Sequence, residues 1–133
     1  MIDDRYYCHR VGTTDSELIF YILLSEGLDQ DPMGALTRTI GKIEQLARAA
    51  AVNEPFKFTS VLSDGERIYA VRHSSDDAPP TLFHRQRDDH VMVVSEPLDE
   101  EEDCQAWREV PAGHVLVIEK GGKLDMAAFM PRI

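Results

Sequence analysis

The sequence predicts an α+β fold, in which helices come first along the chain and antiparallel strands follow. The chain has 133 residues, the length of one ordinary domain. Apolar residues recur at helical spacing up to about residue 53, and beyond it short apolar runs alternate with turn-forming residues. Elements separated along the chain in this way favour an α+β arrangement over alternating α/β units. We therefore expect a single domain over residues 1–133.

A helical hairpin is expected over about residues 14–51. Thr14 to Glu17 fits a capping box, in which Thr14 caps the backbone and Glu17 reaches back to it. The first helix is apolar around so much of its circumference that we expect burial on more than one side, and Gly27 fits its end. The second helix begins at Asp31-Pro32, an N-cap followed by a proline in the first turn. The short connection predicts that the two helices run antiparallel.

The chain from about residue 56 to residue 130 is expected to form antiparallel strands. The expected strands are residues 56–61, 68–71, 81–84, 90–94, 114–119 and 124–129. Turn-forming residues separate the first pair at Ser63–Glu66 and the last pair at Gly121-Gly122. The acidic stretch Asp99–Asp103 lacks the ligand spacing of a calcium loop, so we expect a solvated surface loop there.

The charge balance excludes several classes of partner. Asp and Glu number 24 against 14 Lys and Arg, which gives a net charge of −10. No basic cluster is present in the sequence, so we expect neither nucleic acid nor an anionic membrane as a partner. No apolar run approaches the length of a membrane span, and the N-terminus is too polar for a targeting peptide. Two cysteines, Cys8 and Cys104, form no disulfide framework, so a reducing, cytoplasmic location is expected.

Few residues are candidates for chemistry. Cys8 and His9 are adjacent, and on an extended segment they would point to opposite faces. The sequence holds no ligand spacing typical of a metal site, so we expect no metal and no cofactor. Asp15 stands at the start of the first helix, where a carboxylate stabilises the helix or, alternatively, pairs with the ammonium group of a substrate. Its position alone leaves both interpretations open.

Several short blocks of the sequence occur together in a recognisable order. They are Gly12–Glu17, Phe56–Thr59, Leu62–Arg72, Val94–Leu98, Trp107 and Val110–His114. In this order and spacing they resemble the C-terminal half of class II glutamine amidotransferases, particularly the small stand-alone kind. The resemblance extends from about Val11 to Pro131.

The resemblance implies a fold and a chemistry. The fold would be part of an N-terminal-nucleophile hydrolase, in which two antiparallel sheets are stacked between helical layers. In that family a cysteine at the mature N-terminus attacks the side-chain amide of glutamine and releases ammonia, while an Asn side chain and a Gly backbone N–H stabilise the oxyanion. The aspartate of the motif that matches Thr14–Glu17 pairs with the α-ammonium group of the substrate. The resemblance therefore assigns glutamine binding to Asp15, with Thr14 as a neighbour.

The chain also departs from this family. The nucleophile, the Asn-Gly pair and an Arg that binds the substrate carboxylate precede the matching half, and this chain starts with Met1-Ile2. Cys8 is not expected to replace the nucleophile, because it lies only seven positions before Asp15. We therefore expect no catalytic residue in this chain and no glutaminase activity from it alone.

The expected partners follow from the missing half. Glutamine or another small amino acid is the expected ligand. Strand edges and apolar faces left open by half a fold favour a homo-oligomer, or a complementing chain that carries the N-terminal half. The alternative is a non-catalytic domain, derived from the same family, that binds an amino acid or serves assembly.

Overall fold

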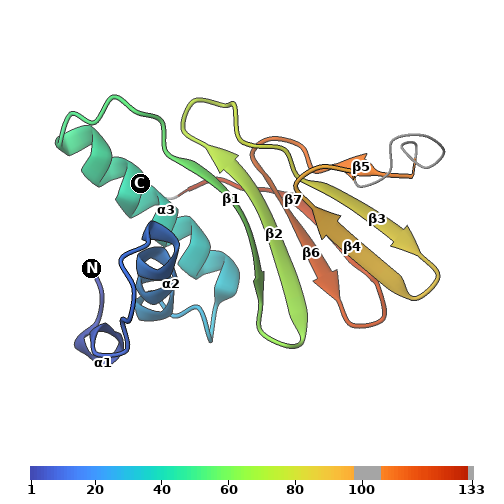
Figure 1. Ribbon diagram of the computed structural model, residues 1–133, viewed down its shortest axis with the longest axis horizontal. Helices are drawn as coiled ribbons and strands as arrows, with labels where there is room; N and C mark the ends of the chain where they lie inside the picture. The colour runs from blue at the N-terminus through green and yellow to red at the C-terminus, as the bar shows by residue number, and fades with distance from the viewer. Residues whose placement is uncertain (98–105, 132–133) are drawn as a thin grey trace. The chain divides into compact units, whose positions relative to one another are not determined.

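The computed structural model describes residues 1–97 and 106–131, and the chain divides into two compact units. Met1–Asn53 with Met130–Ile133 form one, here termed the helical unit, and Glu54–Phe129 form the other, the sheet unit. Figure 1 shows the helices of the first and the strands of the second.

The helical unit contains α1 (Asp4–Tyr7), α2 (Asp15–Ser25) and α3 (Pro32–Ala49). The expected end of α2 is confirmed: Gly27 has a φ of 88°, and the N–H of Leu28 donates to the carbonyl of Leu23 at 3.0 Å. This left-handed glycine with a backward hydrogen bond is a common way to satisfy the last carbonyls of a helix. The expected start of α3 is also confirmed, because Asp31 accepts a hydrogen bond from the N–H of Gly34 at 3.0 Å.

One expectation for the N-terminal region was wrong, and another was confirmed only in part. Cys8 is not extended: it is the C-cap of the short helix α1, with φ −69° and ψ −16°, and the N–H of His9 donates to the carbonyl of Tyr6 at 3.0 Å. Burial of α2 on several sides also holds only in part. Ile22 and Leu23 are buried, but Phe20 is 43% exposed.

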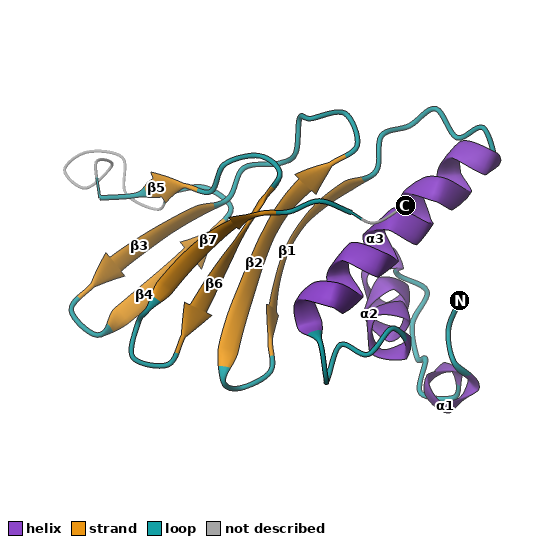
Figure 2. Ribbon diagram, turned by 180° about the vertical axis from the view of Figure 1, so that it is seen from behind, coloured by secondary structure: helices purple, strands orange, loops and turns teal. Residues whose placement is uncertain are grey.

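The sheet unit contains two antiparallel sheets (Figure 2). The four-stranded sheet has the order β1-β2-β6-β7, and the three-stranded sheet has the order β4-β3-β5. The strands are β1 (Lys57–Ser63), β2 (Arg67–Ser74), β3 (Phe83–Arg87), β4 (His90–Val94), β5 (Arg108–Glu109), β6 (His114–Glu119) and β7 (Leu124–Ala128). Every strand expected from the sequence is present, whereas the two-residue strand β5 was missed. Together with the helical unit, this gives the expected α+β fold.

The core of the sheet unit lies between its two sheets. Ala70 on β2 and Leu116 and Ile118 on β6 come from the four-stranded sheet, and Leu82 and Val110 flank β3 and β5 of the other. The partly buried Ile68, Val91, Val93 and Leu124 pack against this cluster. Strand alternation explains the pattern, because Ile68 and Ala70, and Val91 and Val93, are each two residues apart and share a face.

The turns of the sheet unit follow the turn-forming residues of the sequence. Asp64 Oδ1 accepts the N–H groups of Glu66 at 2.8 Å and Arg67 at 2.7 Å, and these hydrogen bonds lower the pKa of the Asp64 carboxyl. Gly121 and Gly122 have φ values of 88° and 85°, as the predicted last hairpin requires. The acidic stretch Asp99–Asp103 and Cys104 lie outside the described residues.

One charged side chain is buried inside the sheet unit. Arg72 on β2 is 8% exposed. Its Nη1 donates to Glu109 Oε1 at 2.7 Å and to the carbonyl of Val110 at 2.6 Å, and its Nε donates to the carbonyl of Pro80 at 3.0 Å. Because a buried guanidinium must be paired, this network ties β2 to β5 and to the loop before β3.

Candidate functional site

The candidate site is the N-terminus of α2, where the structure places Thr14 and Asp15. Thr14 is the N-cap, with φ −73° and ψ 148°, and its Oγ1 accepts the N–H of Glu17 at 3.4 Å. Asp15 is the first residue of the helix and is exposed, and its Oδ1 accepts the N–H of Ser16 at 2.8 Å. The predicted cap is therefore confirmed, and the carboxylate beside it faces water.

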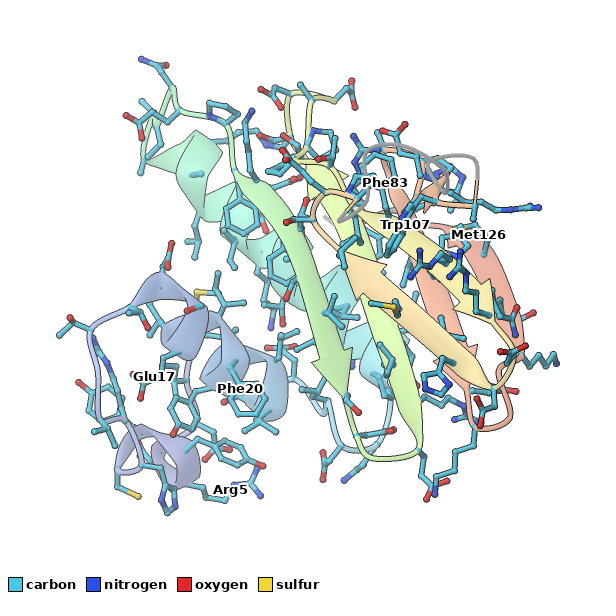
Figure 3. All side chains as sticks on the ribbon, turned by 45° about the vertical axis from the view of Figure 1, so that its right-hand side comes forward. Arg5, Glu17, Phe20, Phe83, Trp107 and Met126 are labelled. Atoms are coloured by element: carbon cyan, nitrogen blue, oxygen red, sulfur yellow. The ribbon has the colours of Figure 1, made fainter. Side chains whose placement is uncertain are left out.

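The side chain of Glu17 completes the helix start differently from the expected capping box. Its carboxylate does not return to the backbone of Thr14. It accepts the N–H of Val11 at 2.8 Å and that of Gly12 at 2.7 Å, so each oxygen takes one of two consecutive backbone donors. Figure 3 shows Glu17 on α2. This contact folds the preceding segment back against the helix start.

Two further hydrogen bonds fix the segment that leads into the site. Tyr21 Oη donates to the carbonyl of His9 at 2.9 Å, and Arg10 Nε donates to the carbonyl of Gly12 at 3.2 Å. The first joins the segment to the middle of α2, and the second closes the segment on itself. Residues 9–14 are thus held by local contacts on both sides of Gly12.

The carboxylate of Asp15 has no cationic side chain as an ion-pair partner within residues 1–97 and 106–131. Its electrostatic environment is set by the positive end of the helix macrodipole, which favours an anion in the first turn. Leu18 and Ile22, three and seven positions further on, share its helix face and line an open hollow of about 480 Å³ with Met1, Ile2, Asp4 and Tyr7. Asp15 itself does not line this hollow.

The cysteine and histidine near the N-terminus do not form a catalytic pair. The Cys8 side chain is exposed, and its Sγ donates to the carbonyl of Arg5 at 3.5 Å. A thiol nucleophile needs a base or a positive environment that lowers its pKa. Among the described residues, no hydrogen bond joins the Cys8 thiol to the His9 ring.

The histidines of the sheet unit lie in separate environments. His73 packs edge-on against Phe129, with ring centroids 5.5 Å apart, and His114 Nδ1 lies 3.0 Å from the carbonyl of Ala112. His84 is buried on β3, and burial, with a smaller contribution from the charge of Arg108, lowers its pKa. The described residues contain no group of three or more His, Cys, Asp or Glu side chains that could hold a metal ion.

None of the helices in the described part of the chain combines the length and the apolar character that crossing a bilayer requires.

Comparison with known proteins finds similar chains among solved structures. No protein-family model matches the chain, and no curated protein matches it. Among solved structures, a glutamine aminotransferase class-II domain protein from Silicibacter pomeroyi is similar, with a TM-score of 0.88 and 39% sequence identity. The likeness covers 99% of this chain and 59% of the length of that protein.

This likeness supports the family resemblance seen in the sequence. The two proteins are alike in amino-acid sequence as well as in backbone structure, and the likeness extends over both units of the chain. The chain spans 59% of the length of the similar protein, so the activity of that whole protein is not assigned to this chain by the likeness.

Proposed function

We propose that this chain is the C-terminal part of a class II glutamine amidotransferase of the small stand-alone kind. Its role would be to bind the α-ammonium group of glutamine through Asp15. The observation that carries the proposal is the exposed Asp15 carboxylate at a capped helix start, in a chain 39% identical to a glutamine aminotransferase class-II domain protein. The N-terminal-nucleophile layering of sheets and helices is part of the same proposal.

The geometry at Asp15 suits an ammonium ligand. A carboxylate has lone pairs for several donors, and among the described residues one backbone group, the N–H of Ser16, donates to the Asp15 carboxylate. The Thr14 cap and the Glu17 contact fix the backbone on which the carboxylate stands. A substrate ammonium with three N–H donors could therefore bind the free positions without moving the chain.

The strength of this contact sets a limit on what Asp15 can do alone. An exposed ion pair contributes about 1 kcal/mol or less, whereas even millimolar affinity requires about 4 kcal/mol. Further groups must therefore hold the carboxylate and the amide of glutamine. In the proposal they come from the N-terminal half of the family fold, together with the nucleophilic cysteine and the oxyanion donors.

The ammonium contact can be tested by titration followed by NMR, which detects weak binding. We expect glutamine to shift the amide resonances of Asp15 and Ser16, and glutaramic acid, which lacks the amine, to leave them unchanged. Asp15→Asn should abolish the shift, and Asp29→Asn, the same change at another exposed position, should preserve it. Equal responses to the two compounds, or a response that survives Asp15→Asn, would contradict the proposal.

The absence of catalysis can be tested by ammonia release. Attacker, base and oxyanion donors act as a unit, so a chain that supplies only the ammonium site should give no turnover. We expect the purified chain to release no more ammonia from glutamine than a heat-denatured sample. Turnover that disappears in Cys8→Ala would show that the chain is a complete enzyme.

The proposed partner is a second copy of this chain or a complementing chain that carries the N-terminal half. Supporting this are the two edges of the four-stranded sheet, β1 and β7, where Val61 is 48% and Met126 is 43% exposed. Unpaired strand edges are ready sites for pairing with another chain. Sedimentation of the chain alone at micromolar concentration should show a species larger than 15.0 kDa, and a strictly monomeric chain would contradict the homo-oligomer.

A further inference from the structure

The outer edge of β7 is a candidate binding surface within the sheet unit. Leu124–Ala128 pair with β6 on one side, and no described strand pairs with them on the other. Leu124 is half-buried, and the other residues of β7 are exposed, Met126 to 43%. Figure 3 labels Met126 on this strand. Because side chains alternate between the two faces of a strand, β7 is open on both faces as well as along its edge.

A hydrogen bond just beyond the ladder of β6 and β7 shows which backbone groups of β7 point outward. The N–H of Phe129 donates to the carbonyl of Gly113 at 2.8 Å. Hydrogen-bonded positions recur at every second residue of an antiparallel pair, so Ala127 and Asp125 also turn their backbone groups toward β6. The residues between these positions direct their N–H and carbonyl groups away from β6. They are Leu124, Met126 and Ala128.

The other edge of the four-stranded sheet, β1, is less suited to pairing with another chain. It begins with Lys57, a residue type that protects strand edges. Lys57 Nζ donates to the carbonyl of Ala78 at 3.0 Å, and Thr59 Oγ1 donates to the carbonyl of Pro80 at 3.0 Å. Polar side chains thus follow β1, whereas β7 carries one charged residue, Asp125. Of the two edges, β7 is the less protected.

The charges at β7 fit a second copy of the chain as the occupant of this edge. Asp125 Oδ2 lies 3.8 Å from Lys123 Nζ, so the edge itself carries no net charge. The whole chain has a net charge of −10, and two such molecules repel each other. A neutral, largely apolar edge is where two copies can approach with the least repulsion.

The outward backbone groups of β7 also select one register for this pairing. They are centred on Met126. When two copies run antiparallel with Met126 opposite Met126, Leu124 of each copy lies opposite Ala128 of the other, and the outward N–H groups meet outward carbonyls. Asp125 then lies opposite Ala127. A shift of one strand by two residues would instead place the two Asp125 carboxylates directly opposite each other, which is destabilising.

We propose that β7 pairs antiparallel with β7 of a second copy, about a twofold axis at Met126, and joins two four-stranded sheets into one. The pairing specifies the homo-oligomer of the proposed function and rests on that part of it. Glutamine binding at Asp15 belongs to the helical unit and can fail without it. A strand of 5 residues buries less than the roughly 800 Å² per partner of a standard interface, so we expect a dissociation constant in the micromolar range.

Proline variants at the two edges test the proposal. Sedimentation of the parent chain at micromolar concentration should show a dimer of twice 15.0 kDa. Met126→Pro should raise the dissociation constant about tenfold or more, because it removes an outward N–H and places a ring on the edge. It breaks no hydrogen bond to β6, since the N–H of Met126 points outward. Val61→Pro, the matched change on β1, should assemble like the parent.

Val61 is a matched control because its position on β1 is equivalent. It is 48% exposed, and the N–H of Asp64 donates to the carbonyl of Arg67 at 3.3 Å, so the backbone groups of Val61 also point outward. A monomeric parent chain would overturn both the homo-oligomer and the pairing. If Met126→Pro assembles like the parent, or if Val61→Pro dissociates, the homo-oligomer stands and the pairing through β7 is wrong.

Cysteine cross-linking tests the register and decides the matter if the proline variant does not fold. In a chain with Cys8→Ser and Cys104→Ser, Met126→Cys would place two thiols opposite each other, at a separation that a disulfide can span. Mild oxidation should therefore link this variant into a dimer. It should not link Ala128→Cys, because the two thiols would lie about 13 Å apart along the strands. Equal yields from these two variants, or cross-linking of Val61→Cys alone, would overturn the proposal.

Discussion

The two units of this protein fix their polar groups in different ways. At the helix starts of the helical unit, side chains bond to neighbours along the chain, as Thr14 does with Glu17 and Asp31 with Gly34. In the sheet unit, Arg72 reaches Glu109 and Val110, 37 and 38 positions away. A few adjacent residues determine the first kind of contact, whereas the second kind depends on how the strands of the sheet unit pair.

This difference bears on function. Asp15 stands where local contacts decide the backbone, so its geometry follows from residues 9–17. The Arg72 network depends instead on strand pairing, because Arg72 belongs to β2 and Glu109 to β5. We therefore expect mutations in the core of the sheet unit to cost more stability than mutations at the helix starts.

Leu116→Ala should have the largest effect. Leu116 is 1% exposed at the centre of the core between the sheets, and removing its buried methyl groups should lower the free energy of unfolding by about 4 kcal/mol. Met126, its cross-strand partner on β7, is 43% exposed, so Met126→Ala should cost about 1 kcal/mol or less. Urea unfolding followed by Trp107 fluorescence measures both. Similar losses would contradict the assigned core.

Arg72→Met should cost about 3 kcal/mol, because it leaves the buried carbonyl of Val110 without its side-chain donor, although the carbonyl of Pro80 keeps the hydrogen bond from Thr59 Oγ1. Glu109 is half-exposed and can be rehydrated, which limits the loss. The control is Arg67→Met on the same strand. Arg67 pairs with Glu119 at the surface, and its loss should cost about 0.5 kcal/mol. If the two variants have the same urea midpoint, the buried Arg72 network contributes no more to stability than the surface pair of Arg67 and Glu119.

Asp31→Ala tests the local contacts of the helical unit. Loss of the N-cap of α3 should cost about 1 kcal/mol and speed amide exchange at Gly34, the donor to Asp31. Asp29→Ala, at an exposed position in the same connection, should leave exchange at Gly34 unchanged. Faster amide exchange throughout the sheet unit as well would contradict the claim that the contact between Asp31 and Gly34 acts only locally.

His84 should give the smallest effect, seen as a dependence of stability on pH. Burial lowers its pKa, so below about pH 6.5 the unfolded chain binds a proton more readily than the folded chain. Stability should therefore fall as the pH drops through this range, and above it His84 should contribute nothing to the slope. His84→Gln should flatten the profile from pH 7 to 5, and His90→Gln, at an exposed position, should not. A profile unchanged by His84→Gln would contradict the buried placement.

The features predicted from the sequence were those with a local signal. Thr14, Gly27, Asp31 and the Gly121-Gly122 turn each have a residue type that fits one backbone conformation, and all four were placed correctly. Strand β5 was missed, because two residues carry no periodicity and their pairing with β3 is long-range. Burial of Arg72 had no signal either, since arginine is normally exposed.

The candidate site shows the same division. The position of Asp15 at a helix start could be predicted, but its proposed ligand came from a family resemblance, because exposure and capping do not identify a substrate. The bonds from Glu17 to Val11 and Gly12 were not predicted. The five-residue spacing from Gly12 to Glu17 was a usable signal, since a glycine there allows the backbone to approach a side chain closely.

That close approach restricts which residues position 12 accepts. A Cβ atom built on Gly12 would lie 2.5 Å from Glu17 Oε2, too near for the carboxylate to stay where it is. The restriction comes from this contact and not from a left-handed backbone angle, since Gly12 is absent from the residues with positive φ. Because the end of a flexible side chain can move aside at little cost, a saturation library at position 12 should recover other residues, but they should lose the hydrogen bonds from Val11 and Gly12 to the Glu17 carboxylate.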